Sequence, residues 1–161
     1  MLLCILIILI GIGIDQLSKL YAVKVLATLT TMPIIPNVFH LTYIENDGAA
    51  FSIFSGKQTF LIIITIIAIV IIGIILFAIP KKKKYFLTNF AFSLILSGAI
   101  GNLIDRIRFN YVVDFFDFRL IGFAIFNIAD CFVVIGCFLL ILAIWRNHFP
   151  QSRSELNLKK H

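Results

Sequence analysis

Charged residues are scarce in this sequence: Asp, Glu, Lys and Arg together make up only 14% of its 161 residues. Hydrophobic residues make up 61%, and the mean hydropathy is +1.06. Soluble domains contain only about 45–50% apolar residues. The composition therefore excludes an ordinary soluble domain and indicates a protein that crosses the membrane several times. The length corresponds to one domain.

Cysteine and histidine are also rare, and neither shows the spacing of metal ligands. The three cysteines, Cys4, Cys131 and Cys137, lie in apolar stretches. Their odd number and wide spacing argue against a disulfide framework or a zinc site. The three histidines are isolated, and no HExxH, GxSxG or Walker motif occurs. We therefore expect no metal and no cofactor.

Two uncharged runs are long enough to cross the membrane, which requires about 20 apolar residues in a helix. They cover residues 59–79 and 85–104. The first run stops at Pro80, and four consecutive lysines, Lys81–Lys84, separate the two. The pattern predicts two membrane helices joined by a short basic loop.

Two further apolar runs, 1–14 and 131–145, are too short to cross alone. The first helix must continue through Asp15 and Lys19, and the last must begin near Asn127. No positive segment precedes the first run and no small-residue cleavage site follows it, so we expect an uncleaved span. We predict four spans, at about residues 2–24, 58–79, 85–105 and 127–146.

The basic residues favour one end of this bundle. The loop at 80–84 and the chain from Arg146 onward carry eight of the 14 basic residues. Because short cytoplasmic loops are rich in Lys and Arg, we expect this loop, both termini and the tail at 147–161 to be cytoplasmic. The connections at 25–57 and 106–126 then face outward. Topology accounts for the net charge of +6, so we expect no nucleic-acid partner.

The outward connections contain more than linkers. Phe39, Leu41 and Tyr43 alternate with other residues at the period of a β-strand, and the sequence at 46–48 is typical of a turn. The aromatic and apolar segment 112–126 is expected to pack at the same interface. We predict one domain, residues 1–146: an all-α membrane protein of four transmembrane helices with a small extracytoplasmic β element.

Polar residues inside the predicted spans occur in pairs at helical spacing. Residues three or four apart share one helix face, and every pair falls at the outward end of its span. Asn46 and Asp114, in the outward connections, can reach the same level. The pairs are Asp15 with Lys19, Asn102 with Arg106, and Asn127 with Asp130. Such convergence is not expected of scattered structural residues.

Asp114 and Asp130 are the best candidates for chemistry, since a carboxylate at membrane depth is costly and marks a functional site. When two carboxylates lie close together, one keeps a proton while the other is charged. The charged one can take a proton from water, and the neutral one can protonate a scissile carbonyl. The pair titrates as a unit, so neither residue is assigned one role.

Several of these residues also have purely structural interpretations. Asp15 and Lys19 form an ordinary ion pair in one interpretation, and Asp130 is a negative charge favoured at a helix start in another. Gly98 and Gly101 are interpreted as sites of close helix packing. Two further acids are interpreted as interface charges: Asp105 and Asp117.

Five blocks, in order, resemble the lipoprotein signal peptidases (signal peptidase II), four-span aspartic peptidases of the bacterial cytoplasmic membrane. Each block is weak alone, but the ordered set is specific and extends over residues 15–130. The blocks are DQLSK at 15–19, NDGAAFS at 46–52, GAIGNLIDR at 98–106, VDF at 113–115 and FNIAD at 126–130. The departures are small: Ser97 stands where Gly is frequent, and Cys131 where a small polar residue is common.

The resemblance implies that Asp114 and Asp130 are the catalytic aspartates. It implies an inner-membrane enzyme that cleaves prolipoproteins before a diacylglyceryl-modified cysteine, with four helices and a periplasmic β-cradle. Membrane lipids are the expected surroundings, and we expect a monomer. The residues expected to order the site or bind substrate are Asn46, Gly48, Asn102, Arg106, Asn127, Asp15 and Lys19.

A small four-span proton-coupled transporter is the alternative, since it too would keep membrane carboxylates and a basic rim. Such a protein places its key carboxylate near the middle of the membrane. Here the acids gather near one face, which favours the peptidase. The sequence leaves open the lipoprotein preference, the Gram type of the host and whether an outer loop closes over the substrate.

Overall fold

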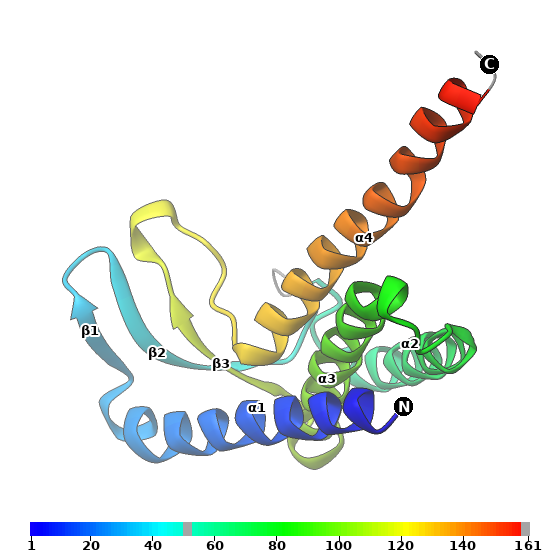
Figure 1. Ribbon diagram of the computed structural model, residues 1–161. Coiled ribbons are helices and arrows are strands. Elements are labelled where there is room, and N and C mark those ends of the chain that lie inside the picture. Colours follow the sequence, from blue (N-terminus) through cyan, green and yellow to red (C-terminus); the bar gives the residue numbers. More distant parts are fainter. Residues whose placement is uncertain (50–52, 159–161) are drawn as a thin grey trace.

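The computed structural model describes residues 1–49 and 53–158 and contains four long helices (Figure 1). They are α1 (Leu2–Leu29), α2 (Gln58–Ala78), α3 (Phe86–Phe109) and α4 (Ile128–Leu158). The segments long and apolar enough to cross a membrane are Leu2–Leu29, Gln58–Ala78, Lys83–Phe109 and Ile128–Arg146. The prediction of four membrane-spanning helices is confirmed, and the chain is a multi-pass membrane protein.

Two helices run further than the predicted spans at the end where the polar residues gather. Helix α1 continues to Leu29 because residues 25–29 contain neither Gly nor Pro. Helix α3 continues to Phe109 and ends at Asn110, whose φ of 62° is left-handed and closes the helix. Helix α4 continues past its membrane segment to Leu158. The last three residues of the predicted tail, 159–161, lie outside the described residues.

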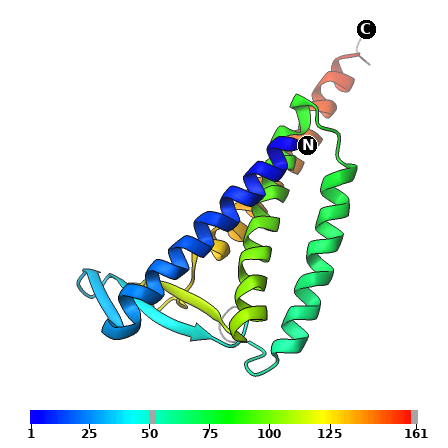
Figure 2. The same ribbon diagram turned by 90° about the horizontal axis from the view of Figure 1, so that it is seen from below.

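Helix α3 is the centre of the bundle and contacts the other three helices (Figure 2). A β-carbon on Gly98 would overlap the carbonyl oxygen of Ala129 in α4, and one on Gly101 would lie 2.5 Å from Asp15 of α1. Both glycines therefore permit the close helix packing that was predicted for them. Small residues at helix contacts are the usual solution in membranes, where apolar burial drives association weakly.

A three-stranded antiparallel sheet of order β1-β2-β3 is attached to one end of the bundle. The strands are β1 (Thr31–Ile35), β2 (Phe39–Asn46) and β3 (Val112–Asp117). The strand predicted from Phe39, Leu41 and Tyr43 is confirmed as β2. The pattern missed the other two strands. Edge strand β1 contains Pro33, and β3 is buried along nearly its whole length, so it lacks the alternation of a half-exposed strand.

The sheet packs on the C-terminal part of α1. Ala22 and Leu26 of the helix form a buried cluster with Val113 and Phe115 of β3. Figure 2 shows the sheet at the end of the bundle where α3 ends and α4 begins, and the N-terminus and the α2–α3 turn at the other end. The fold therefore brings β3 beside the polar ends of α1, α3 and α4.

Candidate functional site

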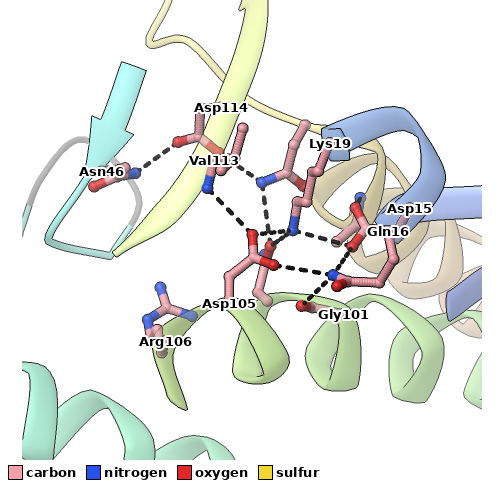
Figure 3. Close-up of polar contacts among 12 residues, drawn as sticks. Asp15, Gln16, Lys19, Asn46, Gly101, Asp105, Arg106, Val113 and Asp114 are labelled. Atoms are coloured by element: carbon pink, nitrogen blue, oxygen red, sulfur yellow. Dashed lines mark hydrogen bonds and ion pairs between the residues drawn. The ribbon is translucent and has the colours of Figure 1, made fainter. Parts of the chain in front are cut away.

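The Lys19 side chain reaches into the middle of a buried polar network between α1 and α3 (Figure 3). Its ammonium group lies 3.0 Å from Asp15 Oδ2 and 3.0 Å from Asp105 Oδ2. It also donates a 2.8 Å hydrogen bond to Asn102 Oδ1. All three ammonium protons thus have an oxygen partner. Lys19 is therefore the hub of a buried charge cluster and does more than pair with Asp15 along one helix.

Asp105 was interpreted as an interface charge, and that interpretation is wrong. The residue is only 1% exposed. Besides Lys19, its carboxylate accepts hydrogen bonds from Gln16 Nε2 at 3.0 Å and from the backbone N–H of Val113 at 3.2 Å. It therefore ties α1 and α3 to strand β3, one residue before Asp114. The available signal was its position three residues after Asn102, on the same helix face.

Asn102 connects the Lys19 cluster to the two candidate carboxylates. Its Oδ1 accepts hydrogen bonds from Lys19 and, at 3.1 Å, from Asn127 Nδ2. Its Nδ2 donates to Asp130 Oδ1 at 2.8 Å. These contacts settle the orientation of the amide, because both oxygen partners are donors and the nitrogen partner is an acceptor.

Asp130 is held by a reciprocal cap at the start of α4. The backbone N–H of Asn127 donates to Asp130 Oδ2 at 3.1 Å, and the backbone N–H of Asp130 donates to Asn127 Oδ1 at 3.0 Å. This is the capping-box arrangement, which satisfies helix N–H groups that have no partner within the helix. The Asp15 carboxylate satisfies another such group, the N–H of Ala129, at 3.0 Å.

Asp114 points from β3 toward the same place and is 2% exposed. Its Oδ1 accepts a 2.6 Å hydrogen bond from Asn127 Nδ2, and its Oδ2 accepts a 2.8 Å hydrogen bond from Asn46 Nδ2 (Figure 3). Burial and the neighbouring charge of Asp130 raise the pKa of Asp114 to about 7. The charge on one of these two carboxyl groups therefore affects the other.

The turn at 46–48 joins the network through its backbone. Asn46 Oδ1 accepts the N–H of Gly48 at 2.9 Å, and the Gly48 carbonyl accepts a hydrogen bond from Arg106 Nη2 at 3.1 Å. Arg106 is 9% exposed, and its Nε has no hydrogen-bond partner among the described residues. Residues 50–52 of this predicted block lie outside the described residues.

All nine predicted site residues belong to one connected hydrogen-bond network at one end of the bundle. The sequence left Asp105 and Gln16 out of this set, and both are part of the network. Gln16 also donates to the carbonyl of Gly101 at 3.2 Å. A single neutral amide beside an aspartate carries no recognisable spacing, which explains why Gln16 was missed.

The network opens onto a cavity of about 540 Å³. Asp114 and Asp130 line it with three polar neighbours: Asn46, Asn102 and Arg106. The rest of the wall is mainly apolar and comes from residues 123–126 and from 133–135 of α4. The cavity thus offers two carboxylates and several N–H donors on one side and a hydrophobic surface on the other.

The two departures from the resembled pattern lie in different places. Ser97 is fully buried, and a β-carbon on Gly11 of α1 would overlap its side chain, so it packs away from the carboxylates. Cys131, in contrast, lines the cavity beside Asp130. In the part of the chain that the structure describes, no group of three or more His, Cys, Asp or Glu side chains is placed to hold a metal ion.

The fold and the site define a multi-pass membrane protein with a carboxylate and amide site at one end of its bundle. The signal peptidase (SPase) II family model matches residues 7–146. The chain belongs to the signal peptidase II family and is therefore a peptidase. Because the chain belongs to a peptidase family, we reject the alternative of a proton-coupled transporter.

Relatives and solved structures agree with this family. The chain is 47% identical over 151 residues to the lipoprotein signal peptidase of Clostridioides difficile (strain 630), covering 94% of this chain and 98% of the relative. It is 38% identical over 136 residues to that of Streptococcus pyogenes serotype M5, covering 84% and 88%. Two bacterial membrane enzyme structures match with TM-scores of 0.77 and 0.72 at 37% and 38% identity. The first match covers 91% of this chain and 89% of that structure, and the second covers 88% and 91%.

Proposed function

We propose that this chain is an aspartic endopeptidase that removes the signal peptide of prolipoproteins by cleaving before a diacylglyceryl-modified cysteine. One observation carries the proposal: Asn127 donates hydrogen bonds to both Asp114 and Asp130, and these two carboxyl groups line the same cavity. The names of the relatives, lipoprotein signal peptidases, support the substrate class.

The reaction needs one proton shared by the two carboxyl groups. The ionised carboxylate takes a proton from a water molecule as the water oxygen bonds to the scissile carbonyl carbon. The protonated carboxyl gives its proton to the carbonyl oxygen, which forms a neutral tetrahedral diol. The C–N bond then breaks as the leaving nitrogen takes the proton that the first carboxylate had removed from water, and one hydroxyl of the diol gives its proton back to the second carboxylate. The products are a new carboxyl group and a free cysteine amine.

The surroundings favour Asp114 as the group that carries the proton before water attack. It is almost fully buried, and burial is the main cause that raises its pKa to about 7. Asp130 is only partly buried and accepts an N–H bond at a helix start, where a negative charge is favoured. Asp130 is then the base that activates water.

Substrate binding divides between the two sides of the cavity. Arg106 lines the cavity, so its guanidinium is placed to hold the peptide part of the substrate, and the apolar wall from 123–126 and 133–135 suits the acyl chains of the lipid. A substrate anchored in the bilayer by its lipid presents its scissile bond near the membrane surface. The position of the site at one end of the bundle matches that depth.

The lysine loop sets the proposed orientation. With Lys81–Lys84 in the cytoplasm by the positive-inside rule, both termini are cytoplasmic and the site lies near the outer face of the cytoplasmic membrane. We propose that the enzyme acts as a monomer among membrane lipids.

The proposal is tested with purified protein in detergent and two forms of one prolipoprotein, with and without the diacylglyceryl group. Cleavage of the lipidated form alone, with mass spectrometry placing the cut before the modified cysteine, is expected. Equal cleavage of both forms would refute the lipid requirement. Excess EDTA should leave the rate unchanged, and inhibition reversed by zinc would contradict the carboxylate mechanism.

A further inference from the structure

The four consecutive lysines between α2 and α3 do not share one role. Lys81 turns back onto the end of α2, where its ammonium group donates to the carbonyl oxygens of Leu76 and, at 2.7 Å, of Ile79. It also donates to Asn89 Oδ1 at 2.8 Å. Lys81 therefore caps the C-terminus of α2, a favourable place for a positive charge.

Asn89 fixes the rest of this turn. It is 6% exposed, and its Nδ2 donates to the carbonyl oxygens of Pro80 at 3.2 Å and Tyr85 at 2.9 Å. The turn is thus anchored at both ends by one buried amide. Lys82, Lys83 and Lys84 project from a defined backbone.

These three lysines are exposed, and the ion pairs of the described side chains all lie elsewhere, at Lys19 and Arg119. Lys84 lies 5.7 Å from the ring centroid of Tyr85, a contact that leaves its ammonium protons available. No acid occurs between residues 48 and 104, so the chain around the turn offers no compensating charge.

The turn also lies at the border of the apolar surface. Phe77 near the end of α2 is 73% exposed and Phe86 at the start of α3 is 54% exposed, on helices that cross the membrane. Apolar side chains on both sides of the turn place the lysines at the depth of lipid headgroups. Figure 2 shows this turn at the end of the bundle opposite the sheet.

We propose that Lys82, Lys83 and Lys84 form a binding site for the phosphate groups of anionic phospholipids, while Lys81 serves the fold. The flanking phenylalanines favour a lipid over a soluble phosphate, because they adjoin the acyl chains of any lipid whose headgroup reaches the lysines. Basic residues at a membrane surface strengthen association with anionic lipid by roughly fivefold each. This site is separate from the peptidase site and does not depend on its mechanism.

The chain contains a local reporter for this site, its single tryptophan. Gly98 of α3 packs against Ala129 of α4, and Gly136 of α4 packs against Ala91 of α3. This antiparallel register, continued along the helices, puts Trp145 level with the lysine turn. Its fluorescence therefore reports on lipids at this end of the bundle, not at the sheet end.

The test reconstitutes the full chain in phosphatidylcholine vesicles that contain brominated phosphatidylglycerol or, at the same mole fraction, brominated phosphatidylcholine. Brominated chains quench tryptophan on contact. The proposal predicts stronger quenching by the anionic lipid in the wild type. The preference for the anionic lipid should fall tenfold or more in the triple variant Lys82→Gln, Lys83→Gln, Lys84→Gln.

A matched variant removes three exposed basic residues at the other end: Lys24→Gln, Lys57→Gln and Arg108→Gln. It should keep the wild-type preference. Lys81→Gln should also keep it while lowering the thermal unfolding temperature, since it loses a helix cap. The proposal is overturned if the wild type shows no preference, if the lysine triple variant keeps it, or if Lys81→Gln alone abolishes it. Competition by soluble phosphate would instead point to a soluble anion and would also overturn it.

Discussion

The side-chain amide of Asn127 donates a 2.6 Å hydrogen bond to the carboxylate of Asp114. The backbone N–H of the same residue donates to Asp130. One residue thus sets the positions of both carboxyl groups, one on strand β3 and the other in the first turn of helix α4. The separation of the pair depends on how α4 begins.

Asn127→Ala is expected to lower kcat/KM by about 100-fold or more, because Asp114 loses a donor. The same variant should be less stable than the wild type by about 1 kcal/mol, because α4 loses its N-terminal cap. Asn127→Ser separates the two effects, since Ser caps helices well but is too short to reach Asp114. We expect Asn127→Ser to recover the unfolding temperature and not the activity. Recovery of both would show that Asn127 acts only as a cap.

The pH profile should fall on its alkaline side near neutrality. The pKa of Asp114 is raised to about 7 by burial and by Asp130, so its proton is present below that pH and lost above it. Because the reaction needs one proton on the pair, kcat/KM should decline about tenfold per pH unit above about pH 7. Initial rates measured in detergent across this pH range, at constant ionic strength, test this prediction. A flat profile through about pH 8 would contradict the shared-proton mechanism.

Lys19→Met should be strongly destabilising. It leaves the carboxylates of Asp15 and Asp105, which are 0% and 1% exposed, without their counter-charge. Breaking a buried ion pair in this way costs about 3–5 kcal/mol. Lys24→Met, on the same helix but exposed, should change stability by less than about 0.5 kcal/mol. Unfolding of both variants in one detergent makes the comparison, and equal stability would show that the Lys19 cluster contributes little.

Two glycine substitutions should change the stability of the protein in opposite directions. A β-carbon on Gly98 meets the backbone of Ala129, so Gly98→Ala should push the start of α4 away and cost about 1–3 kcal/mol. It should also lower kcat by displacing Asp130. Gly13→Ala adds a methyl group into open space, so it should raise stability by up to about 1 kcal/mol through helix propensity. A neutral Gly98→Ala would mean that the α3–α4 contact is not tight.

The spans and most of the network could be predicted because both are encoded locally. Membrane helices show in the length of apolar runs, and pairs such as Asn102 with Arg106 show in the spacing of one helix face. The convergence of five separate segments on one level followed from the order of the spans. The structure adds the contacts themselves, such as the bond of Lys19 to Asn102 across two helices.

The remaining features depend on tertiary packing. Strand β3 is buried on both faces, so its sequence resembles an apolar interface segment. Edge strand β1 contains Pro33, a residue that argues against a strand when only the sequence is considered. Asp105 was interpreted as an interface charge, since no neighbour in the sequence marks its carboxylate as buried. Only the approach of α1, which brings Lys19 and Gln16 to it, makes that carboxylate a buried link between helix and strand.

The central claim, that Asp114 and Asp130 act as a pair on one water molecule, is tested most directly by three matched variants. Asp114→Asn, Asp130→Asn and Asp117→Asn would be assayed for cleavage of lipidated prolipoprotein, with unfolding temperatures measured in parallel. Asp117 lies on the same strand as Asp114 and is also buried. Its carboxylate accepts hydrogen bonds from Thr42 and Arg119, and it is not among the residues that line the cavity. The account predicts that the first two variants fold and lose at least about 1,000-fold in kcat, while Asp117→Asn keeps turnover even where its stability falls. Near-normal turnover by a folded Asp114→Asn or Asp130→Asn variant would contradict it.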